Sequence, residues 1–230
     1  MMADPTSDFA YFESVHQLAI WRTTSASTLH ISNTPLLPRP QASRPIPPAA
    51  APTGTQEQST IPKIRRVLIC HDFKGGYLPY EVAQGIESST TVYTCEYLQY
   101  VDTFVYFSHK LVAIPPVSWI NLMHKNGVKI LGTFIVEGGS GSSKLGEIFK
   151  PGPDSPDAAF YANQLVLLAK TYGFDGWLLN FESTFPTDIF DLPIFHSWLD
   201  YLKDEMHRVI PGSQVIWYDF HKQGMESSAN

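Results

Sequence analysis

Asn180 and Glu182 are the side chains of this sequence that are best suited to chemistry. They lie in FDGWLLNFES, residues 174–183, whose short apolar run is typical of a buried strand. Side chains alternate between the two faces of a strand, so the amide of Asn180 and the carboxyl group of Glu182 are expected to point the same way. An acid beside an amide at a strand end suits the cleavage of a glycosidic bond.

The requirements of glycoside cleavage explain why this pair matters. The leaving oxygen must receive a proton from a carboxyl group, and positive charge at the anomeric carbon must be stabilised. Most glycosidases use a second carboxylate for this, whereas substrate-assisted enzymes use the 2-acetamido oxygen of the sugar itself. An asparagine side chain both donates and accepts hydrogen bonds, so it can hold that acetamide. The Asn-x-Glu pair therefore predicts hydrolysis at a 2-acetamido sugar.

The elements that must position this pair are five short runs of apolar, β-branched and aromatic residues. They are VLICHDF from Val67, FVYFSH from Phe104, VKILGTFIVE from Val128, GWLLNFE from Gly176 and QVIWYDF from Gln214. Helical spacing covers residues 116–126, 158–172 and 192–209 between them. Alternating strands and helices predict a parallel sheet with right-handed crossovers. We therefore expect an α/β fold, a partial (β/α)8 TIM barrel of about five strand–helix units.

Polar residues stand at the end of every predicted strand. They are His71-Asp72, Ser108-His109, Glu137, Asn180 with Glu182, and Tyr218-Asp219. In (β/α)8 barrels the carboxyl ends of the strands form the active-site face, so we expect these residues to meet there.

Five residues near these ends are candidates for binding substrate: Asp72, His109, Glu137, Trp177 and Asp219. Four of them also have a structural interpretation. Asp72 could orient a loop, His109 could bond a backbone carbonyl, Glu137 could form a salt bridge, and Trp177 could pack in the core. The sequence leaves both interpretations open.

Two further zones precede the predicted barrel domain of residues 63–230. Residues 1–30 contain FAYFESVHQLAIW, whose apolar residues are spaced as one face of a short helix capped by Ser14. Residues 31–62 are rich in proline, alanine, serine and threonine. Such a segment cannot bury enough apolar surface to offset the entropy of ordering, so we expect a disordered linker.

Composition excludes several classes of partner. A net charge of −6 and a pI of about 5.7 argue against nucleic-acid binding, which needs a basic face. The start of the chain has no secretory signal pattern, and no apolar run approaches the roughly 20 residues of a membrane span. The two cysteines, Cys70 and Cys95, make no disulfide framework, and Cys70 is expected to be buried in its strand. A soluble cytosolic protein without membrane partners is the prediction.

Several stretches together resemble the cytosolic endo-β-N-acetylglucosaminidases of glycoside hydrolase family 85, in the N-terminal part of the catalytic domain. They are VLICHDFKGGY from Val67, YVDTFVYFSHKLVAIPP from Tyr100, WINLMHKNGVKILGTFIVE from Trp119, FDGWLLNFE from Phe174 and VIWYDF from Val215. AYFESVHQLAIW from Ala10 resembles the leader that precedes this domain in the family.

The resemblance implies cleavage of the β1,4 bond in the di-N-acetylchitobiose core of N-glycans or glycopeptides, often with transglycosylation. It implies Glu182 as the general acid and base, and Asn180 as the residue that orients the acetamide and stabilises the oxazolinium intermediate. Tyr218 would assist close to the acetamide. No metal or organic cofactor is implied.

The chain also departs from the family pattern. Gly138 follows Glu137 where the family usually has tryptophan, so a stacking platform is missing. Five strands are fewer than the eight of a closed barrel, so we expect this chain to have little or no activity of its own. An inactive glycan-binding remnant is therefore one alternative. A chitinase-like hydrolase is another, although its motif D-x-D-x-E has Asp where Asn180 stands.

Overall fold

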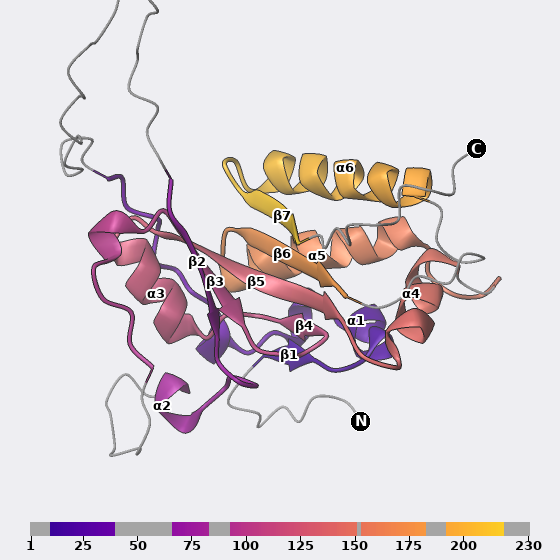
Figure 1. Cartoon of the computed structure of the whole chain (residues 1–230), viewed down its shortest axis with the longest axis horizontal. Helices are drawn as coiled ribbons and strands as arrows, with labels where there is room; N and C mark the ends of the chain where they lie inside the picture. Colours follow the sequence, from indigo (N-terminus) through magenta and orange to yellow (C-terminus); the bar gives the residue numbers. More distant parts are fainter. Residues whose placement is uncertain (1–9, 40–65, 83–92, 151–152, 183–191, 219–230) are drawn as a thin grey trace, which may run out of the picture.

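The computed structural model describes residues 10–39, 66–82, 93–150, 153–182 and 192–218 (Figure 1). Within them, five parallel strands are hydrogen-bonded in the order β2, β3, β5, β6 and β7. Their bounds are Leu68–Asp72, Thr103–Phe107, Lys129–Val136, Gly176–Phe181 and Gln214–Tyr218. Each corresponds to one predicted apolar run, and the predicted mixed α/β class is confirmed.

The larger helices follow the strands along the chain. They are α3 (Val117–Lys125), α4 (Gly141–Phe149), α5 (Ala158–Tyr172) and α6 (Leu192–Val209). The predicted limits of α5 and α6 are confirmed, whereas α4 was not predicted. Helix α5 starts where Asp157 accepts a 2.8 Å hydrogen bond from the backbone N–H of Phe160. It ends at Gly173, whose φ of 80° is the left-handed conformation that glycine adopts readily.

Several short elements were not predicted from the sequence. Strand β1 (Tyr11–Phe12) pairs antiparallel with β4 (Val112–Ala113), and β4 pairs antiparallel with β5. One-turn elements complete the described chain: α2 (Pro79–Val82), η1 (Thr23–Ser25), η2 (Thr28–His30) and η4 (Leu98–Tyr100). Elements this short contain no complete hydrophobic period, so no pattern in the sequence reveals them.

The predicted helix near the start of the chain is confirmed as α1 (Val15–Ile20). Ser14 caps it, and Ser14 and Gln17 form a reciprocal capping box. The helix is an integral part of the fold, because the side-chain amide of Gln164 on α5 donates hydrogen bonds to the carbonyls of Leu18 and Trp21, at 2.8 and 3.0 Å.

Part of the predicted linker is ordered, so the prediction of disorder from residue 31 onward is wrong for residues 32–39. The backbone N–H of Ser32 bonds the carbonyl of Tyr172, and that of Leu37 bonds the carbonyl of His124, both at 3.0 Å. These carbonyls lie in the last turns of α5 and α3. The hydroxyl groups of Ser32 and Thr34 also bond the side chain of Asn121 on α3, both at 2.7 Å, so hydrogen bonds to these two helices fix the segment. The rest of the predicted linker, residues 40–62, lies outside the described residues.

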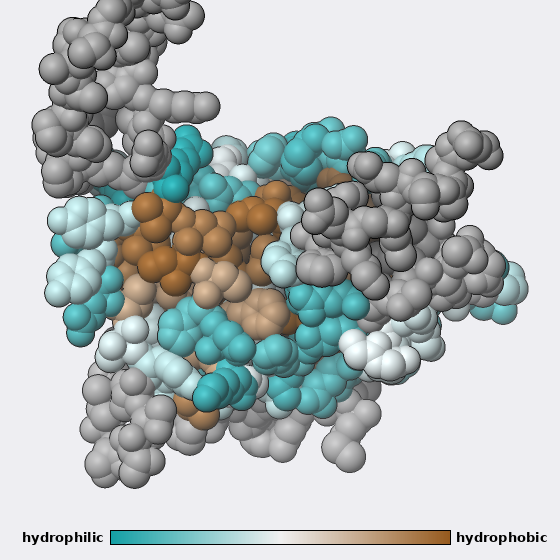
Figure 2. Space-filling model, viewed as in Figure 1, coloured by the Kyte–Doolittle hydropathy of each residue, from teal (hydrophilic) through white to brown (hydrophobic). Residues whose placement is uncertain are grey.

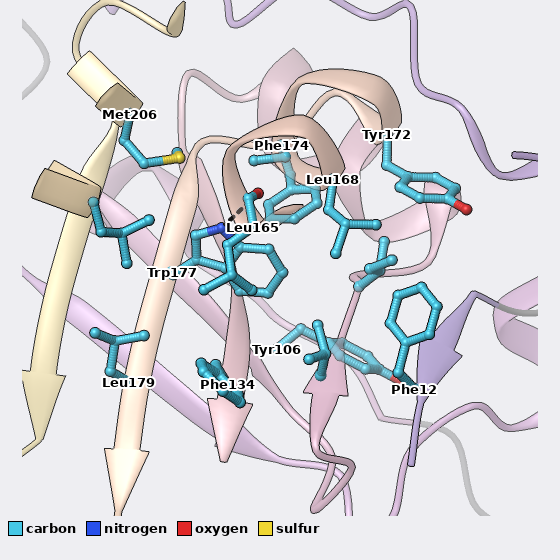
Figure 3. Close-up of a cluster of buried hydrophobic side chains, with 14 of the residues drawn as sticks. Phe12, Tyr106, Phe134, Leu165, Leu168, Tyr172, Phe174, Trp177, Leu179 and Met206 are labelled. Carbon is cyan, nitrogen blue, oxygen red and sulfur yellow. Dashed lines mark hydrogen bonds between the residues drawn. The ribbon is translucent and has the colours of Figure 1, made fainter. Parts of the chain in front are cut away.

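The main core lies between one face of the sheet and the helices (Figure 3). Trp177 of β6 is fully buried there beside Phe174 and Phe134. Its indole N–H donates a 3.1 Å hydrogen bond to the carbonyl of Leu165 on α5. Strand β6 starts at Gly176, where an added Cβ would lie 1.8 Å from the carbonyl oxygen of Gln214, so only glycine allows β6 and β7 to pair here.

Replacing Leu18 with alanine tests whether α1 belongs to this core. Leu18 is fully buried, whereas Ile20 on the same helix is 39% exposed. We expect Leu18→Ala to lower the free energy of unfolding by about 2–5 kcal/mol, because it leaves a cavity under the helix. The matched change Ile20→Ala should cost much less. Urea unfolding checks both, and equal small effects would contradict the packed position of α1.

Candidate active site

The sheet has two faces with different surroundings. One contacts the helices, and the other carries a small separate cluster of buried residues, Val105, Leu131 and Leu178, with Phe107 and Ile216 packed against it. Figure 2 shows hydrophobic surface over the strands in the same view as Figure 1, and no helix of the described residues covers this second face. We call it the open face.

The open face carries the Asn-x-Glu pair. Leu178, Asn180 and Glu182 alternate along β6, so Asn180 and Glu182 share the face of Leu178. Asn180 is 3% exposed, whereas Glu182 is exposed just beyond the strand. The backbone N–H of Glu182 bonds the carbonyl of Val136 at 3.0 Å, which holds the end of β6 to the end of β5. The acid is therefore accessible and the amide is enclosed.

Tyr218 lies next to Asn180. The two residues are partners in the pairing of β6 with β7, and neighbouring strands lie about 4.8 Å apart. Tyr218 is 47% exposed and has the same parity as Ile216, so it shares the open face. Of the strand-end residues, Asn180, Glu182 and Tyr218 are thus brought together on adjacent strands.

Asp72, His109 and Glu137 also come together. The Nδ1 atom of His109 lies 2.9 Å from Oε1 of Glu137, and its Nε2 atom lies 3.4 Å from Oδ2 of Asp72. The hydrogen bond with Glu137 and the nearby Asp72 raise the pKa of His109, although partial burial opposes this. The pKa of Asp72 is lowered, mainly by the backbone N–H of Lys74. The imidazole of His109 thus bonds two carboxylates rather than a backbone carbonyl.

These two groups of residues lie along one edge of the sheet. Val136 pairs with Phe181, so Glu137 and Glu182 follow at the ends of adjacent strands with the same parity. The carboxyl ends of β2, β3, β5, β6 and β7 therefore present one row of polar side chains above the open face.

Two sequence expectations end differently, and a third falls outside the described residues. Trp177 faces the helices and is fully buried, so it packs in the core. The prediction that it stacks on a sugar ring is therefore wrong. Cys70 was expected to be buried but is exposed, because it shares the open face with Asp72. Asp219 lies outside the described residues.

Sequence reasoning missed a buried pair below the site. Nε2 of His124 on α3 lies 2.8 Å from Oδ2 of Asp175, and the backbone N–H of Ile130 donates to the same oxygen at 2.8 Å. Burial disfavours the charged ring, but the hydrogen bond and charge of Asp175 and the carbonyl of Thr34 outweigh it and raise the pKa of His124. Asp175 comes directly before β6, so this pair anchors the strand that carries Asn180. The sequence signal was an aspartate immediately before a predicted strand.

Glu81 is a second residue that the sequence did not reveal. Its carboxylate is buried and accepts hydrogen bonds from the indole N–H of Trp119 at 2.9 Å, the hydroxyl of Tyr106 at 3.2 Å and the backbone N–H of Leu78 at 2.6 Å. Burial raises the pKa of Glu81. These bonds fix the loop after β2 against α3. The residue lies in a four-residue helix, which gives no periodic signal.

The described part of the chain also bears on metal binding and membrane insertion. No group of three or more His, Cys, Asp or Glu side chains there is arranged to hold a metal ion. Of the helices in the same residues, none is both long and apolar enough to span a bilayer.

Comparisons with known proteins agree on one family. The model of glycosyl hydrolase family 85 matches residues 77–226. The cytosolic endo-β-N-acetylglucosaminidase of Mus musculus is 37% identical over 210 residues, which are 91% of this chain and 26% of the mouse protein. Cytosolic endo-β-N-acetylglucosaminidase 2 of Arabidopsis thaliana is 41% identical over 159 residues, 69% of this chain and 22% of the plant protein. The chain thus spans about a quarter of the length of these relatives.

A solved structure shares the fold. The glycoside hydrolase domain of Endo-D from Streptococcus pneumoniae R6 superposes with a TM-score of 0.59 at 21% identity, covering 91% of this chain and 31% of that one. The sequence resemblance seen in the strand-end motifs is therefore matched by a family model, by curated relatives and by a structural neighbour. The chain belongs to glycosyl hydrolase family 85.

Proposed function

We propose that this chain supplies the catalytic residues for hydrolysis of the β1,4 bond between the two GlcNAc residues of an N-glycan core. The observation that carries the proposal is the placement of Asn180, Glu182 and Tyr218 on adjacent strands of the open face. The names of the mouse and plant relatives support the bond class and a cytosolic location. In this proposal the five parallel strands are consecutive strands of a (β/α)8 barrel, and their carboxyl ends form its active-site mouth.

The proposed mechanism is substrate-assisted and retains configuration. Glu182 donates its proton to the glycosidic oxygen while the acetamide oxygen of the sugar attacks C1, so the bond to the leaving GlcNAc breaks and an oxazolinium ion forms. Asn180 accepts a hydrogen bond from the acetamide N–H and keeps the acetamide oxygen aimed at C1. Tyr218 is close enough to hydrogen-bond the same group.

The second step restores the enzyme. Glu182, now a carboxylate, takes a proton from water, and the water oxygen attacks C1 and opens the oxazolinium ring. If a sugar hydroxyl takes the place of water, the glycan is transferred to that acceptor. The exposed position of Glu182 admits either nucleophile, whereas the enclosed position of Asn180 restricts the acetamide to one orientation.

Three substrates test the proposal. The chain alone is expected to have little activity, but a protein that carries it within a closed eight-stranded barrel should cleave a high-mannose glycopeptide and leave one GlcNAc on the peptide, as mass spectrometry of the products would show. A glycopeptide whose reacting GlcNAc carries a 2-hydroxyl group should remain intact, because it lacks the internal nucleophile. Faster cleavage of chitin oligomers than of the glycopeptide would favour a chitinase-like enzyme. Glycan binding without any release would favour a glycan-binding remnant.

A further inference from the structure

His109 occupies a central position among the strand ends. It follows β3, which lies between β2 and β5 in the sheet, so one carboxylate stands on each side of its ring. Asp72 ends β2 at 3.4 Å, and Glu137 follows β5 at 2.9 Å. The side chains of Asp72, His109 and Glu137 are 56%, 43% and 34% exposed, so a ligand on the open face can reach all three.

The backbone holds the ring in this place. His109 has a φ of 55°, the left-handed conformation that few residues other than glycine adopt. Such a conformation costs about 1–3 kcal/mol unless the surroundings enforce it. The ring also packs edge-on against Phe107 of the open face, with ring centroids 5.0 Å apart. The turn therefore directs the ring between the two carboxylates.

The double contact favours the charged form of the ring. A neutral imidazole carries one N–H and can donate to one carboxylate, whereas an imidazolium carries two and can donate to both. The nearby charges favour the imidazolium, since the pKa of His109 is raised by the bond with Glu137 and by Asp72. Lys110, the next residue, is turned away and pairs with Glu13 at 2.8 Å over the ring of Tyr11.

Asp72, His109 and Glu137 together form what we call the bridge. The other charged groups near it do not replace its contacts. His71 points to the opposite face of β2, where its ring packs against Phe73 and Tyr93. Lys74 contacts Asp72 through its backbone N–H at 2.7 Å. Glu182 ends the strand next to Glu137, so the bridge lies directly beside the acid of the proposed reaction.

We propose that His109 is a positioning residue, which as an imidazolium holds the carboxylates of Asp72 and Glu137 in place to accept hydrogen bonds from the hydroxyl groups of the bound glycan. This inference rests on the proposed function, because it assigns these three residues to the binding of the same glycan. His109 bonds Oε1 of Glu137, so Oε2 has no partner among the residues that the structure describes and suits a sugar hydroxyl. Bonds from hydroxyls to a carboxylate are stronger than bonds to a neutral acceptor.

The bridge makes glycan affinity depend on pH. When His109 loses a proton, its ring can hold only one carboxylate, and the other is free to move. We therefore expect the Kd for an N-glycopeptide to rise about 10-fold between about pH 5.5 and about pH 8, the range in which a histidine loses its charge. In His109→Gln the affinity should be low at both pH values and nearly constant, because glutamine does not titrate in this range.

The first measurement needs no activity. NMR titration of the histidine rings should give His109 a pKa above the ordinary value of about 6.5, and Glu137→Gln should move it downward. The signal of His16, exposed on α1, is the internal control and should not respond to Glu137→Gln. If the pKa of His109 is about 6.5 and does not change in Glu137→Gln, the proposal is wrong.

The second measurement separates this inference from the proposed function. The Kd for the glycopeptide is measured by calorimetry in Glu182→Gln and in Glu182→Gln/His109→Gln, neither of which is expected to turn the ligand over. The expected pH dependence in the first variant and its loss in the second support the bridge, even if the wild-type protein releases no glycan. Equal affinities and equal pH profiles in the two variants would show that His109 does not position the carboxylates.

Discussion

Replacing Glu182 with glutamine should lower the rate of glycopeptide cleavage by about 100- to 10,000-fold and leave the affinity for the glycan nearly unchanged. Glutamine has the same length and can still hydrogen-bond, but it cannot donate a proton to the leaving oxygen or accept one from water. Glu182 is exposed beyond the end of β6, so the change removes no core packing. The measurement is kcat/KM on a glycopeptide, with the Kd measured separately.

A matched control is available on helix α4. Glu147 is exposed there, outside the row of strand-end side chains, and Glu147→Gln makes the same chemical change. It should leave kcat/KM within a factor of two or so, as expected of a surface substitution. Wild-type rates in Glu182→Gln would remove Glu182 from the proposed chemistry. A comparable loss in Glu147→Gln would mean that the assay reports stability instead.

The second large effect is expected at the buried pair below the site. Asp175→Ala should lower the free energy of unfolding by about 3–5 kcal/mol, because it leaves the buried His124 ring and a backbone N–H without their acceptor. The side chains of His124 and Asp175 are only 6% and 13% exposed, so water cannot easily replace the carboxylate. Since Asp175 anchors the start of β6, the position of Asn180 depends on it as well.

An exposed ion pair supplies the comparison. Asp200 on α6 lies 2.7 Å from Lys203, with side chains 72% and 45% exposed. Asp200→Ala should leave the free energy of unfolding nearly unchanged, because solvent screens such pairs. Urea unfolding of both variants gives the two values. A small effect of Asp175→Ala, similar to that of Asp200→Ala, would contradict the anchoring role.

Helices and strands are predicted well from the sequence where a long hydrophobic repeat is followed by a residue that ends the element. Helix α5 was predicted with its limits because 15 residues of apolar spacing are followed by Gly173. Alternation along a strand placed Asn180 and Glu182 on one face, and the structure has them there. The same alternation puts Trp177 on the other face, so parity alone excludes the stacking role that was predicted for it.

Other features depend on contacts between segments that are distant in sequence. Residues 32–39 have the composition of a linker, yet hydrogen bonds to α3 and α5 order them. The bridge at His109 requires a left-handed residue after β3 and two carboxylates from neighbouring strands. Neither the conformation nor the pairing has a local sequence pattern, because both arise only when the sheet forms.

The most direct test of the Asn180 and Glu182 pair is to watch the amide of Asn180 while an intermediate analogue binds. A thiazoline analogue of the oxazolinium intermediate is titrated into the protein, and the side-chain N–H signals of Asn180 are followed by NMR, with Asn180→Ala for assignment. We predict that these two signals shift with the analogue concentration and that Asn180→Ala weakens binding at least several-fold. Binding that leaves the Asn180 signals unmoved, with equal affinity in Asn180→Ala, would show that the sugar's acetamide is held elsewhere.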